Sequence, residues 1–230
     1  MEEIRIIDFF MNFRKEDSYF RHVRDDLLKC IPEKSKIGRV LDVGCGDGST
    51  ASYIKQKFNA KEVIGIEKNS SLKNIAEQHL DRFIIGDIGA IDLPFEQNYF
   101  DLIILADILE HLYDPWNVLK KLYQFLKENG TILSSIPNVQ HWSILFNLLK
   151  GRWDYKSVGI LDNTHIRFFT RKSIEEMFLK NDFKIEEITS SVGKEIRFLN
   201  AFTLGIFSGF FTYRYFVAAK KQRCPEGNNQ

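Results

Sequence analysis

Short apolar runs separated by amphipathic segments recur along most of the chain, and several runs end at an acid, a glycine or a proline. Continuous apolar runs of this length are typical of strands covered on both faces, as in a parallel sheet. We expect strands at residues 40–43, 62–67, 82–85, 100–105, 131–136, 183–188 and 212–219. Helices are expected between them, at residues 50–58, 70–80, 115–130 and 170–181.

Capping residues mark some of these helices. Asp114-Pro115 predicts a helix start, because Asp is a good N-cap and proline is favoured at the first helical position. Gly130 is expected to end that helix, and Thr170 to cap the next one. This order of elements predicts an α/β fold with a Rossmann-like, doubly wound sheet, right-handed crossovers and helices on both faces. In such a sheet the C-terminal strand ends share one edge, where ligands bind.

The most informative polar pattern follows the first expected strand, where three glycines alternate before a helix. The candidate binding residues of this loop are Asp42, Gly44, Cys45, Gly46 and Gly48. Backbone N–H groups at a helix N-terminus suit a small anionic group, and glycine lets a ligand approach closely. A dinucleotide fingerprint needs a third glycine where Ser49 stands, and Asp47 would repel a pyrophosphate. S-adenosylmethionine, with one carboxylate and a cationic sulfur, fits better than a nicotinamide dinucleotide; an ordinary glycine-rich turn is the structural alternative.

Polar residues also follow the next expected strands. An acid about 20 residues after the glycines is typical of a ribose-binding position, and Glu67 stands close to that spacing. A solvated loop acid is the alternative for each position taken singly. Together the strand-end residues are expected to share one edge: Glu67, Lys68, Asp87, Ile88, Ala106, Asp107 and Asn138.

The stretch 137–169 is rich in aromatic residues and histidine, and long loops of this kind are uncommon unless they serve a function. We expect it to form a lid over the pocket for a second substrate. Asn138, His165 and Arg167 are its candidate substrate-binding residues. Its aromatic side chains either contact the substrate or only pack the lid.

Composition limits the possible functions. A length of 230 residues fits one α/β domain, which divides into a helical cap (1–37), a cofactor-binding core (38–136), the lid, a C-terminal helix and strands (170–220) and a disordered tail (221–230). A net charge of +1 gives no electrostatic footprint for nucleic acid. Neither a metal cluster nor a signal sequence is evident, so a cytoplasmic enzyme is expected. The apolar segment 196–218 is too short to span a membrane, although peripheral contact stays open.

These motifs together resemble the class I S-adenosylmethionine-dependent methyltransferases, from the glycine loop through Asp107-Ile108-Leu109-Glu110-His111-Leu112 to Thr164-His165-Ile166-Arg167-Phe168-Phe169-Thr170. The subgroup resembles enzymes of glycan and lipopolysaccharide synthesis and O-methyltransferases of the ubiquinone pathway. The resemblance implies a seven-stranded sheet whose last strand runs antiparallel between strands five and six. It also implies that Asp42 binds the amino group of the cofactor, that Glu67 binds its ribose, and that Asp87 and Ile88 bind its adenine.

A methyl group on a sulfonium is already activated, so the enzyme must mainly align the acceptor. A hydroxyl acceptor also benefits from a base. His111 is the first candidate for this base and His165 the second, with Asp107 positioning the acceptor or His111. The acceptor is expected to be a hydroxyl of a small molecule, glycan or lipid-linked substrate. Phenolic or quinone precursors, amines and carboxylates stay open, as does a cofactor-binding regulatory module without turnover.

Overall fold

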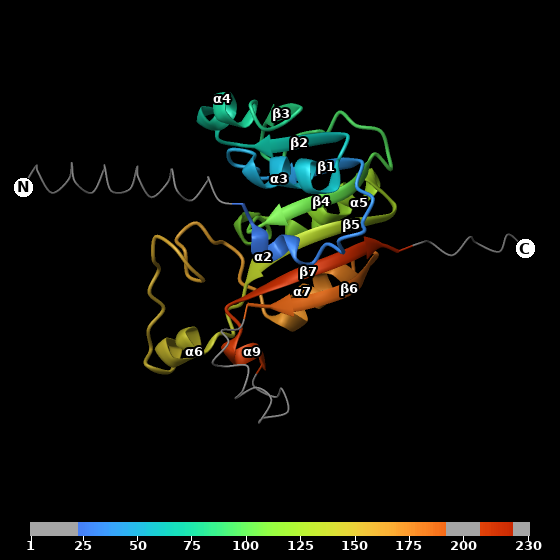
Figure 1. The fold of residues 1–230 in the computed structure, drawn as a ribbon. Helices are drawn as coiled ribbons and strands as arrows, with labels where there is room; N and C mark the ends of the chain where they lie inside the picture. Colours follow the sequence, from blue (N-terminus) through green and yellow to red (C-terminus); the bar gives the residue numbers. More distant parts are fainter. Residues whose placement is uncertain (1–22, 192–207, 223–230) are drawn as a thin grey trace, which may run out of the picture.

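A single mixed sheet of seven strands forms the centre of the molecule (Figure 1). The computed structural model describes residues 23–191 and 208–222. The strands are β1 (Arg39–Val43), β2 (Glu62–Glu67), β3 (Arg82–Ile85), β4 (Phe100–Ala106), β5 (Leu126–Pro137), β6 (Phe183–Ser190) and β7 (Arg214–Lys221), in the order β3-β2-β1-β4-β5-β7-β6. Strand β7 pairs antiparallel with both β5 and β6, whereas β1 to β5 pair in parallel. The expected insertion of the last strand between strands five and six is confirmed.

The two faces of the sheet carry different helices because successive strand residues point to opposite sides. Leu41 and Val43 belong to a core cluster that includes residues of α5 (Pro115–Phe125) and α7 (Arg171–Leu179). Val40 belongs to a second cluster on the other face. That cluster includes residues of α2 (Asp25–Leu28), α3 (Ser49–Phe58) and α4 (Lys73–Ala76), which follows the short helix η1 (Ser70–Leu72). The predicted doubly wound arrangement is confirmed.

The capping residues act as expected, but two helices end early. The helix expected at residues 70–80 is η1 followed by α4, which ends at Ala76, and α5 also stops short. Asp114 accepts a hydrogen bond from the Asn117 amide at the start of α5, and Thr170 caps α7. Helix α5 stops at Phe125, so the predicted end at Gly130 is wrong. Leu126 is instead extended and pairs with Phe100 of β4, so strand pairing overrides the local helical pattern.

The lid leaves the sheet at the end of β5 and returns before α7 (Figure 1). It contains the apolar helix α6 (Trp142–Leu149) and then a long irregular segment. The short helix α9 (Ser208–Phe211) leads into β7. No helix in the described ranges has the length and apolar character needed to cross a membrane.

Three expectations concern residues outside the described ranges. Most of the helical cap (1–22), residues 196–207 of the apolar segment and residues 223–230 of the tail all lie there. Within the described part of the apolar segment, β7 is an interior strand whose residues 215–219 are buried. Strand β7 begins at Arg214 and ends at Lys221, so both ends lie two residues later than expected.

Candidate active site

The C-terminal ends of β1, β2, β4 and β5 bring the expected polar residues to one edge of the sheet. The register aligns Asp42 of β1 with Gly65 of β2 and Ile104 of β4, so the loops that follow these strands emerge together. After β4 the chain forms the short helix η2 (Leu109–His111), and its Glu110 carbonyl accepts hydrogen bonds from the lid amides of Ile166 and Arg167. The glycine loop, η2 and the lid therefore border the same region.

The glycine loop has a conformation that side chains oppose. Gly44, Gly46 and Gly48 have φ angles of 69°, 55° and 81°, a region that favours glycine. A Cβ atom on Gly44 would lie 2.1 Å from Cδ1 of Ile108, so the segment after β4 packs directly against the loop. Gly48 is the N-cap residue of α3. The backbone thus turns sharply into a helix N-terminus, as an anion-binding loop requires.

Asp42 is a buried carboxylate at the base of this loop. Its Oδ2 atom has no hydrogen-bond partner among the described residues. Burial, together with the nearby negative charge of Glu67, raises the pKa of Asp42 to about 7. A buried carboxylate with a free oxygen is unfavourable alone and suits a ligand that brings an ammonium group.

Glu67 is also buried, but its oxygens have partners. Oε2 accepts from the Gly46 amide at 3.2 Å and Oε1 accepts from the Asn69 amide at 2.9 Å. The first contact joins the end of β2 to the glycine loop, and each oxygen keeps a lone pair for a ligand hydroxyl. Lys68 beside it is exposed. Beyond β3, Asp87 is exposed with Oδ1 bonded to the Gly89 amide, and Ile88 is buried.

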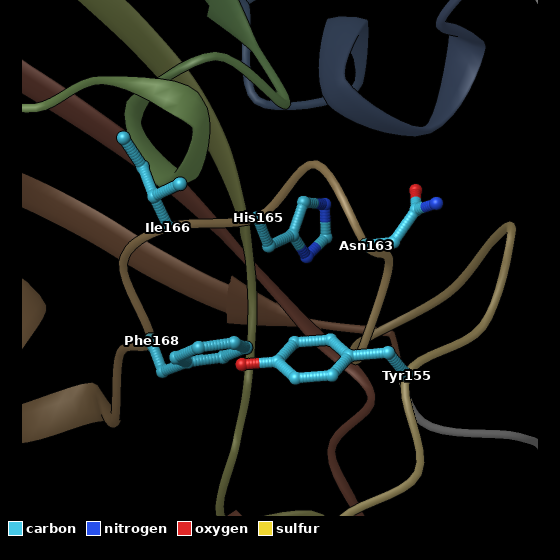
Figure 2. A pocket seen from close by; sticks show the side chains of 5 residues that line it. All are labelled: Tyr155, Asn163, His165, Ile166 and Phe168. Carbon is cyan, nitrogen blue, oxygen red and sulfur yellow. The ribbon is translucent and has the colours of Figure 1, made fainter.

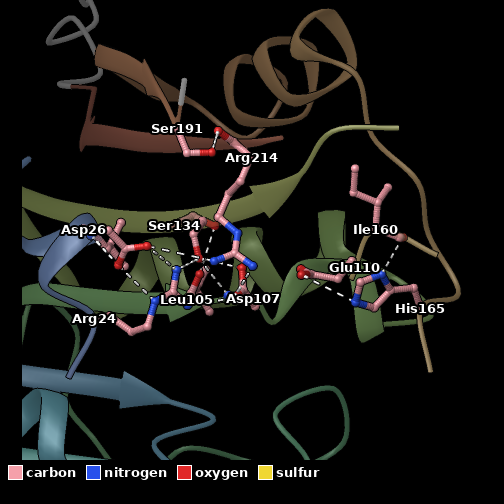
Figure 3. A network of polar contacts seen from close by, with 12 residues as sticks. Arg24, Asp26, Leu105, Asp107, Glu110, Ser134, Ile160, His165, Ser191 and Arg214 are labelled. Atoms are coloured by element: carbon pink, nitrogen blue, oxygen red, sulfur yellow. Dashed lines mark hydrogen bonds and ion pairs between the residues drawn. The ribbon is translucent and has the colours of Figure 1, made fainter. Parts of the chain in front are cut away.

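Asp107 lies at the centre of an ion-pair network (Figure 3). Its Oδ2 accepts a hydrogen bond from Arg24 at 2.7 Å and forms an ion pair with Arg214 at 3.2 Å, and its Oδ1 accepts from the Ser135 hydroxyl at 2.8 Å. Arg24 also pairs with Asp26. This network ties α2, β5 and β7 to the residue that follows Ala106 at the end of β4. The carboxylate of Asp107 is thus held by two arginines and a serine.

Two histidines and a glutamate meet where η2 contacts the lid. The rings of His111 and His165 pack edge to face with centroids 4.7 Å apart. Nδ1 of His111 lies 3.2 Å from the Thr164 carbonyl oxygen. Burial lowers the pKa of His111, and the neighbouring His165 lowers it further, so neutral imidazole is favoured. Glu110 is 1% exposed, and burial raises the pKa of its carboxyl well above the ordinary value, with a smaller contribution from the charge of Asp107.

An open cavity of about 470 Å³ adjoins this pair of histidines. Its lining residues are Tyr155, Asn163, His165, Ile166 and Phe168, all from the lid. Figure 2 shows Tyr155 and Phe168 along one side, with His165 and Asn163 across from them. Aromatic walls with a few polar groups suit a ring-bearing small molecule.

The other two lid candidates make contacts within the protein. Asn138 is fully buried, and its Nδ2 donates to the carbonyl oxygens of Gly209 and Thr212 at 2.7 Å each. Arg167 donates to the Tyr113 carbonyl and lies over the Trp116 ring. Both residues fasten the lid to its surroundings, Asn138 beside α9 and β7, and Arg167 beside α5.

Sequence reasoning missed three charged residues at this edge. Arg24 and Arg214 come from opposite ends of the chain, and no local pattern links them to Asp107. Glu110 directly precedes His111. The sequence does not show that Glu110 is buried, because a glutamate in such a segment is usually exposed to solvent.

The profile of a family described as a methyltransferase domain matches residues 14–188, which is more than half of the chain. The chain belongs to this methyltransferase family. It is 26% identical over 200 residues to a demethylmenaquinone methyltransferase of Thermotoga maritima, covering 80% of this chain and 84% of that protein. It is 26% identical over 157 residues to a ubiquinone biosynthesis O-methyltransferase of Acinetobacter baylyi, covering 66% of this chain and 65% of that protein.

Solved structures agree on the fold. A structure described as a SAM-dependent methyltransferase from Archaeoglobus fulgidus superposes with a TM-score of 0.65 at 21% identity, covering 91% of this chain and 99% of that one. The methyltransferase therefore has the class I fold and uses S-adenosylmethionine. The residues present fit this cofactor, because the loop offers an anion site while the orphaned Asp42 oxygen offers a site for the ammonium group.

Proposed function

We propose that this methyltransferase transfers the methyl group of S-adenosylmethionine to a hydroxyl of a ring-bearing small molecule bound under the lid. The observation that carries the proposal is the position of His165. It lines the aromatic cavity and at the same time packs against His111, on the segment that touches the glycine loop. A base and an acceptor pocket therefore adjoin the cofactor loop.

Each part of the site has a separate task in this proposal. S-adenosylmethionine, when bound, supplies a methyl group on a positively charged sulfur. Asp42 binds its ammonium group, the glycine loop its carboxylate, and Glu67 its ribose hydroxyls, with Asp87 and Ile88 at the adenine. The Tyr155 and Phe168 rings hold the acceptor so that its oxygen is aligned for attack, which is the main source of rate in such a reaction.

His111 is the proposed general base. Its lowered pKa keeps the imidazole neutral near pH 7, and the Thr164 carbonyl fixes Nδ1 as the protonated nitrogen. Nε2 is then the atom that takes the proton of the acceptor hydroxyl, and His165 is the second candidate for this role. General-base catalysis contributes about 10²–10⁴-fold in rate.

The experiment is a methyl-transfer screen with matched acceptors. Purified protein is incubated with S-adenosylmethionine and a panel of catechols and phenols, hydroxylated sugars, glycolipids, aromatic amines and aromatic acids, and the products are identified by mass spectrometry. The proposal expects methyl ethers of ring-bearing hydroxyl compounds. Methylation of amines or carboxylates only, or cofactor binding without turnover on any class, would contradict it. The quinone-pathway relatives support beginning with catechols and phenols.

A further inference from the structure

Glu110, His111 and His165 bring three potential metal-ligand atoms within 4.8 Å of one another. Two of the residues are adjacent on η2, and the third comes from the lid. The trio is not an exposed acidic cluster, because Glu110 and His165 are buried and His111 is partly buried. It differs from the cofactor site, whose expected residues lie on the glycine loop and the ends of β2 and β3.

The carboxylate of Glu110 lacks the partners that a buried charge requires. Neither Oε1 nor Oε2 has a hydrogen bond to any residue that the structure describes. Figure 3 shows the carboxylate pointing toward the imidazole of His165, and Oε1 lies 4.0 Å from Nε2. The nearby arginines, Arg24 and Arg214, pair with Asp107 instead. A buried carboxylate left in this state is unfavourable, and a bound cation would satisfy it.

Both imidazoles are oriented as metal ligands commonly are. Nδ1 of His165 lies 2.9 Å from the Ile160 carbonyl oxygen, and Nδ1 of His111 lies 3.2 Å from that of Thr164. A carbonyl oxygen can only accept, so each ring carries its hydrogen on Nδ1 and keeps a lone pair on Nε2. Metal-binding histidines usually have this anchored arrangement, in which the outer N–H donates to a backbone carbonyl.

We propose that Glu110, His111 and His165 bind one divalent transition-metal ion of the zinc class. Two imidazoles and one carboxylate suit Zn²⁺ or Co²⁺ better than Mg²⁺ or Ca²⁺, which prefer all-oxygen sites. Tetrahedral ligands about 2.1 Å from a zinc ion lie about 3.4 Å apart. The 4.0 Å separation of Glu110 and His165 therefore closes by roughly half an ångström when the metal binds.

A fourth coordination position would be open to a ligand in the lid cavity, because His165 belongs to the trio and also lines the cavity. This part of the inference rests on the proposed function, since it assumes that the acceptor hydroxyl occupies the cavity. A metal ion held by the trio would polarise the acceptor oxygen and lower the pKa of its hydroxyl, and the released proton would pass to solvent water. With the ion bound, Nε2 of His111 would be a metal ligand, so the ion would replace His111 as the group that activates the acceptor hydroxyl.

The test is metal binding by the untagged, full-length protein after treatment with a chelator. Zn²⁺ binding is measured by calorimetry, and Co²⁺ binding by its visible absorption, which reports the coordination geometry. The expected result is one ion per chain with a tetrahedral or five-coordinate Co²⁺ spectrum. Glu110→Gln and His165→Ala should each weaken binding by about 100-fold or more, because losses from outer-shell residues alone reach that size.

Matched controls separate the trio from other histidines. His79→Ala and His141→Ala remove imidazoles outside the trio and should bind Zn²⁺ and Co²⁺ as the wild type does. Thermal melting and S-adenosylmethionine binding verify that each variant is folded. The metal site would be overturned if the wild type bound neither Zn²⁺ nor Co²⁺. It would also be overturned if Glu110→Gln and His165→Ala bound the ions as tightly as the wild type does.

The two proposals fail in different ways. If the metal-free protein methylates hydroxyl acceptors at the full wild-type rate, the metal site is not used in catalysis and the proposed function stands. If the ion binds as expected while the acceptor screen yields no methyl ether, the proposed function fails and the metal site stands.

Discussion

Replacing Asp42 by asparagine should stabilise the ligand-free protein near neutral pH and at the same time remove cofactor binding. Burial raises the pKa of this carboxyl from 3.8 to about 7. Because the pKa is raised in the folded state, the folded protein holds the proton more tightly, and stability is lost as the pH rises through this range. At 1.36 kcal/mol for each pKa unit, the ionised carboxylate costs at most about 4 kcal/mol above about pH 7.

The asparagine side chain carries no charge, but its amide stays buried beside the same groups. We therefore expect the substitution to restore about half of this upper bound on the lost folding stability. A gain of about 2 kcal/mol raises Tm by about 4–8 °C in a protein of this size. The assay is thermal melting of wild type and Asp42→Asn between about pH 4 and about pH 8. The stability difference should be largest at the high end and should become small near pH 4, close to the unfolded-state pKa of 3.8, where the folded carboxyl is protonated.

Glu67→Gln is the matched control for Asp42→Asn. Both oxygens of Glu67 accept backbone hydrogen bonds, so an amide removes an acceptor and should give no stabilisation. It should still weaken cofactor binding. If Asp42→Asn is less stable than the wild type by the same amount at every pH, the carboxylate does not destabilise the fold and the proposed ammonium site loses its physical basis.

Four further predictions concern catalysis, the loop and the scaffold. His111→Ala should bind S-adenosylmethionine normally while kcat falls by about 10²–10⁴-fold, measured with the best acceptor of the screen; an unchanged kcat would remove the base role. Because burial lowers the pKa of His111, the wild-type kcat should hold through mildly acidic pH and fall only when the pH drops below the ordinary histidine range. Gly44→Ala should lose cofactor binding and stability by calorimetry and melting, since its Cβ would collide with Ile108. Asp114→Ala removes the α5 cap and should lower unfolding free energy by about 1 kcal/mol in denaturant titrations, with normal cofactor affinity.

Local patterns predicted most of the fold. The apolar runs at residues 62–67 and 82–85 coincide with β2 and β3, and Asp114 and Thr170 cap helices as expected. These features depend on side-chain alternation and capping, which are local properties of the sequence. The place of β7 between β5 and β6 came from family resemblance, because the apolar pattern does not specify which strands pair.

Long-range contacts account for what the sequence did not show. Leu126 leaves the helical pattern because it pairs with Phe100, 26 residues earlier in the chain. Arg24 and Arg214 meet at Asp107 only once α2 and β7 are in place. The partners of Asn138 likewise lie on a distant segment, so its structural contacts were not visible beside its expected role in substrate binding.

The central claim is that the strand-end residues around the glycine loop bind S-adenosylmethionine. Calorimetric titration of the purified protein with S-adenosylmethionine, S-adenosylhomocysteine and NAD tests it most directly. The account predicts one site per chain with micromolar affinity for both adenosyl ligands, no binding of NAD, loss of binding in Asp42→Asn and weakened binding in Glu67→Gln. Tight binding of NAD, or full affinity for S-adenosylmethionine in both variants, would contradict the account.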